Sequence, residues 1–354
     1  LEKLLANYYE TKYAVTCTSG TAALHGALVA LDLPVGSEII TTSVADIGIV
    51  IPIIYENLIP IFADIDSETY NITAENVEKR ITKKTVAVIA VHLAGNPCDL
   101  DSLSELCKKY NIILIEDFSQ AHGAIWDKNK VGSFGDISYG SFQQSKQITC
   151  GEGGVIVTNN KKLYNRAFIG VDKAWQRYRP LEKRFYEFLA PNVRFNSIQA
   201  AILKPQLKRL DNLIERKRQI AKKFSKCIDN FSDYIKPQRI YPKGNSSYYS
   251  FPLFVKSNSF RNNLVDLLDS KYNMYCAKGY ANPVPLYQCV NALINPNKYG
   301  KGFNYSTYKY PKGTCPNAEE LLKRSFLIPF NENYSDLEVK EIASRLSTAV
   351  SESL

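Results

Sequence analysis

The chain has 354 residues, 45% hydrophobic and 12% aromatic, which supports a large buried core and excludes a disordered protein. The formal charge of +9 is spread along the chain, and a solvated helix face explains the densest basic run, residues 204–223, better than nucleic-acid binding does. The longest apolar run, residues 47–55, is too short to cross a bilayer, and no signal peptide opens the chain. We therefore expect a cytoplasmic protein with no nucleic-acid partner and no membrane segment. Because the chain begins inside a predicted helix, we also expect residues to be missing in front of Leu1.

The cysteines and histidines argue against a metal site. The eight cysteines are dispersed through apolar segments without a CxxC pair, as is typical of reduced core thiols in a cytoplasmic protein. Of the three histidines, we expect His25 in the core and His92, which ends a strand, in a structural role. No spacing of histidines matches a catalytic triad or a metal site, so we expect no metal.

The first half of the chain alternates apolar strand-like runs with amphipathic helical stretches. Strands are predicted at residues 13–19, 38–42, 59–65, 85–92 and 112–117. Helices are predicted at residues 21–33, 73–81 and 100–110. Two further strand-like runs lie within residues 136–158 and flank a stretch with one lysine and a glycine pair. Strands that are apolar throughout and alternate with helices indicate an α/β fold with a parallel sheet covered on both faces.

The second half begins with one long predicted helix, residues 196–227, whose apolar positions, among them Ile198 and Ile202, lie on roughly one face. After Pro237 the residue pattern changes to shorter elements. It predicts a strand at 248–255, a helix at 261–272 and a loop at 279–316. A strand at 325–330 and a helix with Ser335 as its N-cap close the chain. We therefore place a large domain at residues 1–235 and a smaller C-terminal α+β domain at residues 236–354.

Ser19, Gly20 and Thr21 join the first predicted strand to the first long helix. Backbone N–H groups at such a helix start, together with the positive end of the helix dipole, suit a phosphate group. Gly20 permits a close approach of the backbone, and the hydroxyls of Ser19 and Thr21 can add donors. For this turn taken alone, a simple N-cap is the alternative.

Asp117 ends the apolar strand IILIED, at the edge where open α/β sheets bind ligands. A carboxylate there can pair with the ring nitrogen of pyridoxal phosphate (PLP) and keep it protonated, which makes the ring an electron sink. A solvated or capping acid is the alternative for Asp117 alone. Gln120 and His122 follow in SQAHGA and can reach the same pocket.

Lys146 follows the strand that carries Ser141 and precedes Gly153 and Gly154. A lysine in a dry pocket beside a cation can lose its proton and act as nucleophile and base. Ser141 is placed to bind a phosphate, and the two glycines allow close backbone packing under a flat cofactor. We therefore expect Lys146 to carry PLP as a Schiff base.

Seven motifs occur in a fixed order: SGTAAL, PIFADID, VAVIAVHLAGNPCDL, IEDFSQAHGA, VGSFGDISYGSF, the lysine with GEGG, and PNVRFNSIQAAI. In this order they resemble the DegT/DnrJ-type sugar aminotransferases, PLP enzymes of the aspartate aminotransferase fold (fold type I). The closing segment YPKGTCPNAEELLKRSFLIPF is similar too, so the resemblance runs from about residue 3 to the C-terminus. It implies that an amino group passes from glutamate or glutamine to a keto-sugar, with a nucleotide-linked one favoured, or to a keto-cyclitol.

The resemblance also implies roles around the cofactor ring. Lys146 is the Schiff-base lysine and proton shuttle. Asp117 pairs with the pyridine nitrogen, and Gln120 contacts the ring or its phenolic oxygen.

On the phosphate side, the resemblance assigns Gly20, Thr21 and Ser141 as the groups that hold the phosphate. Asn192, in the PNVRF motif, reaches the phosphate of the neighbouring subunit, which implies a homodimer with shared active sites. Arg194 in the same motif is a weaker candidate, either for the partner's site or for structure.

One departure from the family pattern lies near Asp46. The family usually places an aromatic residue at this point, stacked on the PLP ring, whereas residues 41–50 contain none. Either another side chain stacks there, or Asp46 faces the pocket. Two alternatives stay open: a PLP-binding regulatory or structural protein without turnover, and a PLP-dependent sugar dehydratase. In dehydratase relatives histidine replaces the lysine, so Lys146 favours transamination.

Overall fold

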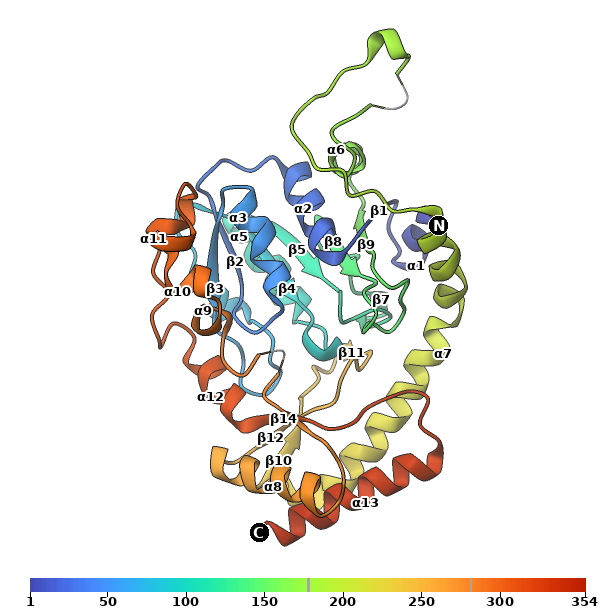
Figure 1. The fold of residues 1–354 in the computed structure, drawn as a ribbon, viewed down its shortest axis with the longest axis vertical. Coiled ribbons are helices and arrows are strands. Elements are labelled where there is room, and N and C mark those ends of the chain that lie inside the picture. Colours follow the sequence, from blue (N-terminus) through green and yellow to red (C-terminus); the bar gives the residue numbers. More distant parts are fainter. Residues whose placement is uncertain (177–178, 281) are drawn as a thin grey trace.

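The structure is a computed structural model that describes residues 1–176, 179–280 and 282–354. Its centre is a seven-stranded sheet with the strand order β1-β9-β8-β5-β4-β2-β3 (Figure 1). The strands of this large sheet are β1 Tyr13–Cys17, β2 Glu38–Thr42, β3 Ile59–Ala63, β4 Thr85–Val91, β5 Ile113–Asp117, β8 Ile137–Ser141 and β9 Gly154–Thr158. Each strand predicted in the first half overlaps one of them.

The large sheet is mostly parallel. β9 runs antiparallel to both of its neighbours, β1 and β8, while the pairs from β8 to β3 are parallel. As a result, β1, β8, β5, β4 and β2 all end at the same edge of the sheet. The residues that directly follow these strands are therefore brought together there, although they lie far apart in the sequence.

Five helices accompany the strands of the first half: α2 Gly20–Leu31, α3 Ile51–Tyr55, α4 Ala74–Glu78, α5 Leu100–Tyr110 and α6 Lys161–Gly170. α2 packs against β8, β9 and α6 and buries residues on almost every side, including Leu24 and Leu28. The packing is close enough that a Cβ atom at Gly26 would lie 2.9 Å from the side chain of Ile156. The start of α2 is thus held firmly against the sheet.

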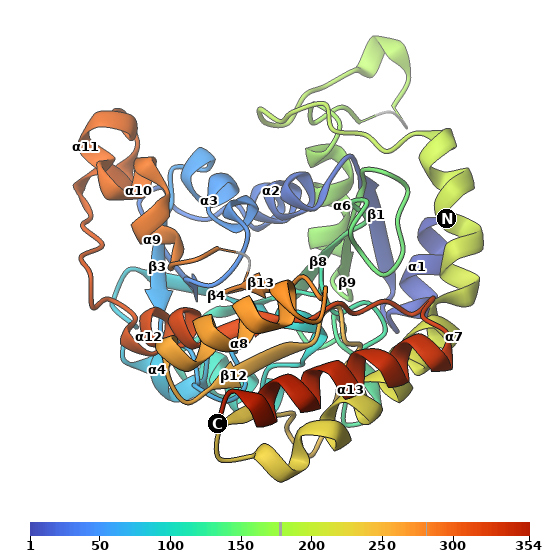
Figure 2. The same ribbon diagram turned by 60° about the horizontal axis from the view of Figure 1, so that its bottom comes forward.

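Three further helices frame the molecule: α1 Glu2–Tyr8, α7 Ser197–Ile228 and α13 Asp336–Glu352. α7 begins with a capping box formed by Asn196 and Gln199, and α13 with one formed by Ser335 and Glu338, which confirms the predicted N-cap at Ser335. α13 runs beside the C-terminal half of α7 in both views (Figures 1 and 2). In the described part of the chain, no helix is both long and apolar enough to cross a membrane.

The basic run on α7 is not a uniformly solvated face. Arg216 and Lys223 both pair with Asp336 at the start of α13, at 2.9 and 2.8 Å. Lys217 is buried and lies 3.1 Å from Glu332. Part of the positive charge in this run therefore holds α13 against α7.

A second sheet forms at the far end of α7, with the order β10-β12-β14-β13 and antiparallel pairs throughout. Its elements are β10 Ile235–Pro237, β12 Pro252–Val255, β13 Ala277–Lys278 and β14 Ser325–Leu327, and α8 Asn258–Ser270 packs on it. A small third sheet, β11-β6-β7, joins the two halves of the chain, because β11 Gly244–Asn245 pairs with β6 Ile125–Trp126, which in turn pairs with β7 Asn129–Lys130.

The predicted loop at 279–316 is wrong in part, since it contains three short helices, α9 Leu286–Cys289, α10 Asn291–Ile294 and α11 Pro296–Tyr299, before α12 Pro316–Arg324. This segment returns to the large sheet. The Leu286 N–H donates to the Ser43 carbonyl at 2.9 Å, and the Tyr310 hydroxyl donates to the Pro60 carbonyl at 2.9 Å. Residues 286–322 thus share the core of the large sheet, and a domain boundary at residue 235 stays a prediction.

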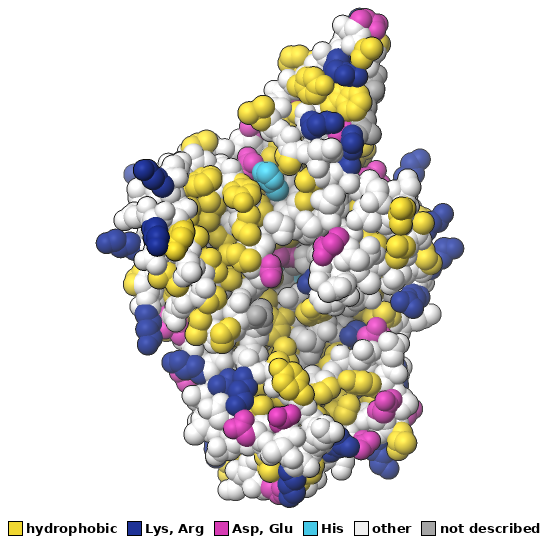
Figure 3. Space-filling model, viewed as in Figure 1, with side chains coloured by type: hydrophobic (Ala, Val, Ile, Leu, Met, Phe, Trp, Pro, Cys, Tyr) yellow, Lys and Arg dark blue, Asp and Glu magenta, His cyan; other side chains and the backbone are white. Residues whose placement is uncertain are grey.

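Between α6 and α7 the chain forms a projection that leaves the body of the molecule; its described part is residues 179–190, which contain a short 3₁₀ turn at Leu181–Lys183 (Figure 1). Hydrophobic and basic side chains gather on it (Figure 3). Leu189 is 98% exposed, and Phe185 and Tyr186 are also exposed. Ile198 and Ile202, expected on the packed face of α7, are exposed beside it. Within the described residues, Ile198 and Ile202 are therefore left without cover, while Leu203 on the same helix is buried.

Candidate active site

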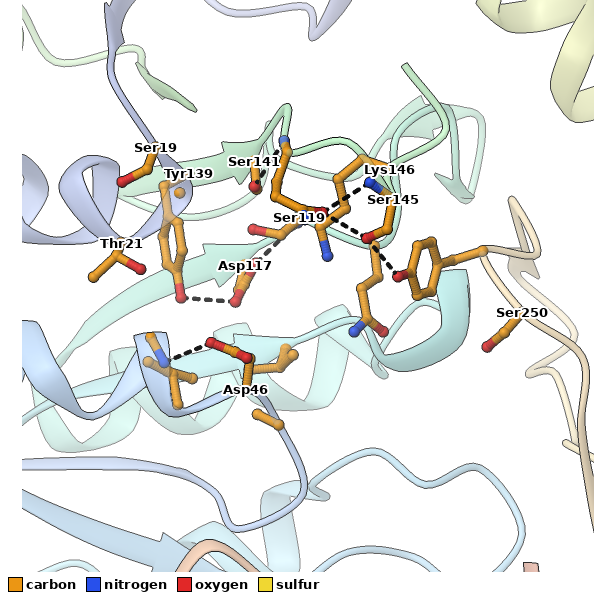
Figure 4. A pocket seen from close by; sticks show the side chains of 18 of the residues that line it. Ser19, Thr21, Asp46, Asp117, Ser119, Tyr139, Ser141, Ser145, Lys146 and Ser250 are labelled. Carbon is orange, nitrogen blue, oxygen red and sulfur yellow. Dashed lines mark hydrogen bonds between the residues drawn. The ribbon is translucent and has the colours of Figure 1, made fainter. Parts of the chain in front are cut away.

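A cavity of about 470 Å³ opens at the edge of the large sheet where the parallel strands end (Figure 4). Its volume lies within the range of roughly 300–1,000 Å³ that is typical of small-molecule sites. All the predicted site residues except Asn192 line this cavity: Ser19, Gly20, Thr21, Asp117, Gln120, Ser141 and Lys146. The fold thus collects residues from four separate sequence motifs in one place.

One end of the cavity is formed by the turn from β1 into α2. Ser19 is the N-cap, and its hydroxyl accepts from the Ala22 N–H at 3.1 Å. Helix geometry leaves the N–H groups of Gly20 and Thr21 without acceptors inside the helix, so they are available to an anion. Ser141 lies directly beside this turn, because a Cβ atom on Gly20 would come within 2.7 Å of the Ser141 Cβ. Only glycine permits this approach.

The glycine pair after the lysine packs closely, but not against the cavity. A Cβ atom on Gly154 would lie 2.1 Å from the Ser19 carbonyl oxygen, and one on Gly153 would lie 2.7 Å from the Cys150 sulfur. Neither glycine lines the cavity. The expectation of packing under a flat cofactor is therefore corrected: Gly154 lets β9 pass directly behind the turn at Ser19.

Lys146 lies in the loop between β8 and β9, and its ammonium group points into the cavity region beside Ser145 (Figure 4). The Nζ atom lies 4.8 Å from the centroid of the Tyr249 ring, a cation–π contact. Tyr249 is itself fixed by a 3.0 Å hydrogen bond between its hydroxyl and that of Ser145. The contact places the amine against the Tyr249 ring at the cavity lining.

Asp117 is the last residue of β5 and is nearly buried. Its two carboxylate oxygens have different donors. The Ser119 N–H donates to Oδ1 at 2.8 Å, and the Tyr139 hydroxyl donates to Oδ2 at 2.7 Å (Figure 4). Each oxygen keeps a lone pair for a further donor from the cavity, such as a protonated ring nitrogen.

Gln120 presents its amide nitrogen to the cavity. Its side-chain oxygen accepts from the Ala94 N–H at 2.9 Å and from the Tyr280 hydroxyl. Because a backbone N–H can only donate, the atom that faces it must be the amide oxygen, and the NH₂ group is left for a ligand. Gln120 can thus donate to an oxygen on a bound ring.

The three histidines lie outside the cavity lining. His92 is buried, accepts from the Cys98 N–H at 3.0 Å through Nδ1 and lies 3.2 Å from Glu116 through Nε2, which is the structural role we expected. His25 is not a core residue: its side chain is 22% exposed and pairs with Glu56 at 2.6 Å. His122 does not reach the pocket directly, but its Nε2 contacts the Ser141 carbonyl at 2.7 Å from behind.

Asp46 lines the cavity on the wall where the family usually has an aromatic residue. Its carboxylate accepts from the Gly48 N–H at 2.8 Å and caps a 3₁₀ turn, Ile47–Ile49. The neighbouring wall residues are Ala45, Gly48 and Ile49. This wall therefore presents a carboxylate and aliphatic groups instead of an aromatic ring.

Asn192 and Arg194 lie on the projection side, outside the cavity of their own chain. Asn192 is exposed, and Arg194 pairs with Asp172 at 2.9 Å. The adjoining Val193 carbonyl accepts from the Thr18 N–H at 2.9 Å, so this segment runs past the turn at Ser19, and neither Asn192 nor Arg194 lines the cavity.

Sequence reasoning missed three tyrosines of the cavity: Tyr139, Tyr249 and Tyr280. Tyr139 precedes Ser141 by two residues on β8, and period-two alternation could have placed both on one face. Tyr249 and Tyr280 come from the C-terminal half, and no local pattern in the sequence points to their position.

The residues present fit PLP. A phosphate fits the glycine cradle formed by Gly20 and Ser141, a ring nitrogen fits the carboxylate of Asp117, and Lys146 offers an amine to the aldehyde. Within the residues that the structure describes, no group of three or more His, Cys, Asp or Glu side chains could hold a metal ion. The fold and this set of groups define a PLP-dependent enzyme of the aspartate aminotransferase class.

Comparisons with known proteins give the family. The model described as the DegT/DnrJ/EryC1/StrS aminotransferase family matches residues 1–347. GDP-perosamine synthase of Escherichia coli O157:H7 is 41% identical over 231 residues, which cover 65% of this chain and 62% of that enzyme. The spore coat polysaccharide biosynthesis protein SpsC of Bacillus subtilis is 30% identical over 351 residues, 96% of this chain and 86% of that protein. The X-ray structure of the aminotransferase from Psychrobacter cryohalolentis has a TM-score of 0.90 and 27% identity, and the match covers 99% of this chain and 90% of that one.

The chain therefore belongs to the DegT/DnrJ/EryC1/StrS aminotransferase family, and it is a PLP-dependent aminotransferase whose homologues are sugar aminotransferases. The predicted fold class, an α/β PLP-transferase with a large mostly parallel sheet, is confirmed. The predicted cofactor is confirmed as well.

Proposed function

We propose that this chain transfers an amino group from glutamate or glutamine to the ketone of a nucleotide-linked sugar. The observation that carries the proposal is the cavity in which Lys146, Asp117 and the start of α2 face one another. Bound PLP supplies the electron-withdrawing ring that makes transfer of an α-proton feasible. The side chains of the protein supply binding, orientation and proton transfer.

Each proposed role follows from the place of the residue in the cavity and from the family resemblance. Lys146 holds the cofactor through Nζ and, once displaced by an amino donor, uses the same nitrogen to carry a proton. Asp117 binds the ring nitrogen, and the Gln120 amide donates to the ring oxygen. Ser141, together with the turn of Ser19, Gly20 and Thr21, binds the phosphate.

The choice of a nucleotide-linked keto-sugar rests on the relatives and on the cavity lining. The relative that acts in GDP-perosamine synthesis shares 41% identity over the matched region. Beyond the cofactor groups, the cavity carries hydroxyl, amide and carboxylate side chains that suit a substrate with many hydroxyls: Asp46, Ser119, Gln143, Ser145, Glu152 and Ser250. A keto-cyclitol offers the same groups and is the second substrate to be tested.

We propose a homodimer as the active unit. The exposed apolar side chains of the projection and of the start of α7 need cover, and a second copy supplies it. Asn192 is exposed at the base of the projection and lies outside the cavity of its own chain. In the dimer, Asn192 would complete the phosphate site of the partner.

A reducing compartment, the cytoplasm, is proposed as the location. All eight cysteines are free, and six of them are buried. Thiols kept apart in a core are typical of proteins that fold under reducing conditions.

The role of Lys146 is tested with Lys146→Ala. We expect the variant to lose the visible absorbance of the lysine-bound cofactor, because no other amine lines the cavity in the described part of the chain. Borohydride reduction followed by peptide mass spectrometry should place the pyridoxyl group on the Lys146 peptide of the wild type. Lys161→Ala, at an exposed position, is the matched control. An unchanged spectrum for Lys146→Ala would reject the assignment.

Donor and acceptor are identified in two half-reactions. Wild-type enzyme mixed with glutamate or glutamine should lose its visible band as the cofactor takes up the amine. The aminated enzyme is then mixed with nucleotide-linked keto-sugars, free keto-sugars and keto-cyclitols. Return of the band with the nucleotide-linked sugar supports the proposal, and return only with a cyclitol contradicts it.

A further inference from the structure

Tyr139 occupies the centre of β8, directly beside Asp117. In the parallel pairing of β5 with β8, Asp117 and Tyr139 are register partners, so their Cα atoms lie opposite each other on neighbouring strands. Tyr139 also shares a face with Ser141, because side chains two residues apart point to the same side of a strand. One strand therefore presents both a phosphate-side hydroxyl and a hydroxyl next to Asp117.

The hydrogen bond between Tyr139 and Asp117 is short and buried. Tyr139 is 3% exposed, and its hydroxyl donates to Asp117 Oδ2 at 2.7 Å (Figure 4). The backbone holds the tyrosine in place as well, since the Phe118 N–H donates to the Tyr139 carbonyl at 3.0 Å. The hydroxyl thus has a fixed direction toward one carboxylate oxygen.

The charges around the hydroxyl keep its proton in place. Burial raises the pKa of Tyr139 well above the usual value, and the negative charges of Asp117 and Asp46 raise it further. Tyr139 is therefore a donor throughout the working pH range. A donor that cannot ionise stabilises the charged form of the carboxylate that it faces.

We propose that Tyr139 is a positioning residue that holds the Asp117 carboxylate aimed at the cofactor's ring nitrogen. The proposal rests on the proposed function, in which Asp117 pairs with that nitrogen. The proton between them can sit on the nitrogen, beside a charged carboxylate, or on the carboxylate, beside a neutral ring. The hydrogen bond from Tyr139 favours the first arrangement, in which the ring withdraws electrons more strongly.

Removal of the hydroxyl should therefore move this proton toward Asp117. The matched variant is Tyr139→Phe, which keeps the ring and its packing. With PLP labelled with ¹⁵N in the pyridine ring, we expect the nitrogen resonance to shift from the protonated toward the unprotonated position. Loss of a hydrogen bond to a charged group should slow the glutamate half-reaction about 10- to 100-fold in single-turnover experiments.

Controls separate this effect from a structural one. Tyr305→Phe removes another buried hydroxyl, which donates to the Ala292 carbonyl far from the cavity, and should leave the resonance unmoved. In an Asp117→Asn background, Tyr139→Phe should add no further shift. If Tyr139→Phe fails to fold, Tyr139→Met removes the hydroxyl with a side chain that adapts to the space.

The outcomes distinguish the two proposals. If wild-type protein forms no lysine-bound cofactor, the proposed function fails and this inference fails with it. If wild type binds PLP with a protonated nitrogen and the Tyr139 variants give the same resonance and half-reaction rate, only the inference on Tyr139 is overturned. A shifted resonance with unchanged PLP affinity supports it.

Discussion

At the scale of residues, neighbouring acids in one motif take opposite roles. Asp117 faces the cavity, whereas Glu116, one residue earlier on β5, is fully buried on the other side. Burial alone would raise the pKa of Glu116, but hydrogen bonds from His92 and from the Gly132 and Gly135 N–H groups hold it below its usual range. The motif IED therefore contains one structural carboxylate and one site carboxylate.

His122 makes the folding stability of the protein depend on pH. Its Nε2 donates to the Ser141 carbonyl, and its Nδ1 accepts from the Tyr9 hydroxyl at 2.5 Å, so the ring is neutral. Burial lowers the pKa of His122 to about 4. In the unfolded chain an ordinary histidine binds a proton below about pH 6.5. Between these values the unfolded state holds more protons, so folding stability falls as the pH is lowered.

We expect this histidine to cost about 2 kcal/mol of stability when the pH is lowered from 7 to 5. His122→Gln cannot take up the proton, so its unfolding midpoint should fall less over the same range. Thermal denaturation of both proteins at the two pH values measures the difference. Equal losses of stability in wild type and variant would contradict the prediction.

At the scale of elements, α7 is positioned by a buried charge. Lys217 points inward, lies 3.1 Å from Glu332, and its nitrogen lies 4.9 Å from the centroid of the Phe330 ring. Burial lowers the pKa of Lys217. From the sequence we predicted that this basic run is a solvated helix face. The inward direction of Lys217 was not predictable, because it depends on where α13 and the loop before it pack against α7.

Glu332→Gln should destabilise the protein by about 2 kcal/mol, because it leaves the buried ammonium group without its counter-charge. Lys217→Met should be close to neutral, since it removes the charge and keeps the apolar stem over Phe330. Denaturant unfolding measures both changes.

Asp336→Asn is the control, because that carboxylate pairs with Arg216 and Lys223 at an exposed position. It should cost less than Glu332→Gln. A larger loss for Lys217→Met than for Glu332→Gln would reject the account.

At the scale of the whole molecule, the cavity draws on both halves of the chain. Lys146 and Asp117 come from the first half, and Tyr249 and Tyr280 come from the second. The segment at 286–322 also packs into the core of the large sheet. Relative movement of the two halves would therefore change the cavity itself, and in the proposed dimer a second copy would be a third contributor.

The dimer is tested at the projection. Leu189→Glu places a charge at a side chain that is 98% exposed on the projection and should weaken association about 100-fold or more, because two leucines are lost from each dimer. Sedimentation analysis measures the mass, and PLP titration should show weaker binding if Asn192 completes the partner's site.

Leu337→Glu, at an exposed leucine on α13, should leave both measurements unchanged. A wild-type protein that sediments as a monomer, or a Leu189→Glu variant that remains a dimer with full PLP affinity, would contradict the proposal.

The sequence by itself determined the strands, the main helices and the motifs that carry Lys146, Asp117 and the turn at Gly20. These signals are local: apolar runs, helical spacing and a glycine where the backbone must approach closely. The Ser335 cap was equally predictable, since a capping box spans only four residues. Seven of the predicted site residues line one cavity, but the sequence did not show how they meet, and their roles at the cofactor stay predictions.

Only the tertiary structure decided what surrounds these residues. It brought Tyr139 opposite Asp117 through strand register, turned Gln120 through contacts with Ala94 and Tyr280, and placed Gly154 behind Ser19. Each of these contacts joins positions from separate elements. Their geometry depends on sheet order and helix docking, and hydrophobic periodicity within one segment carries no information about either.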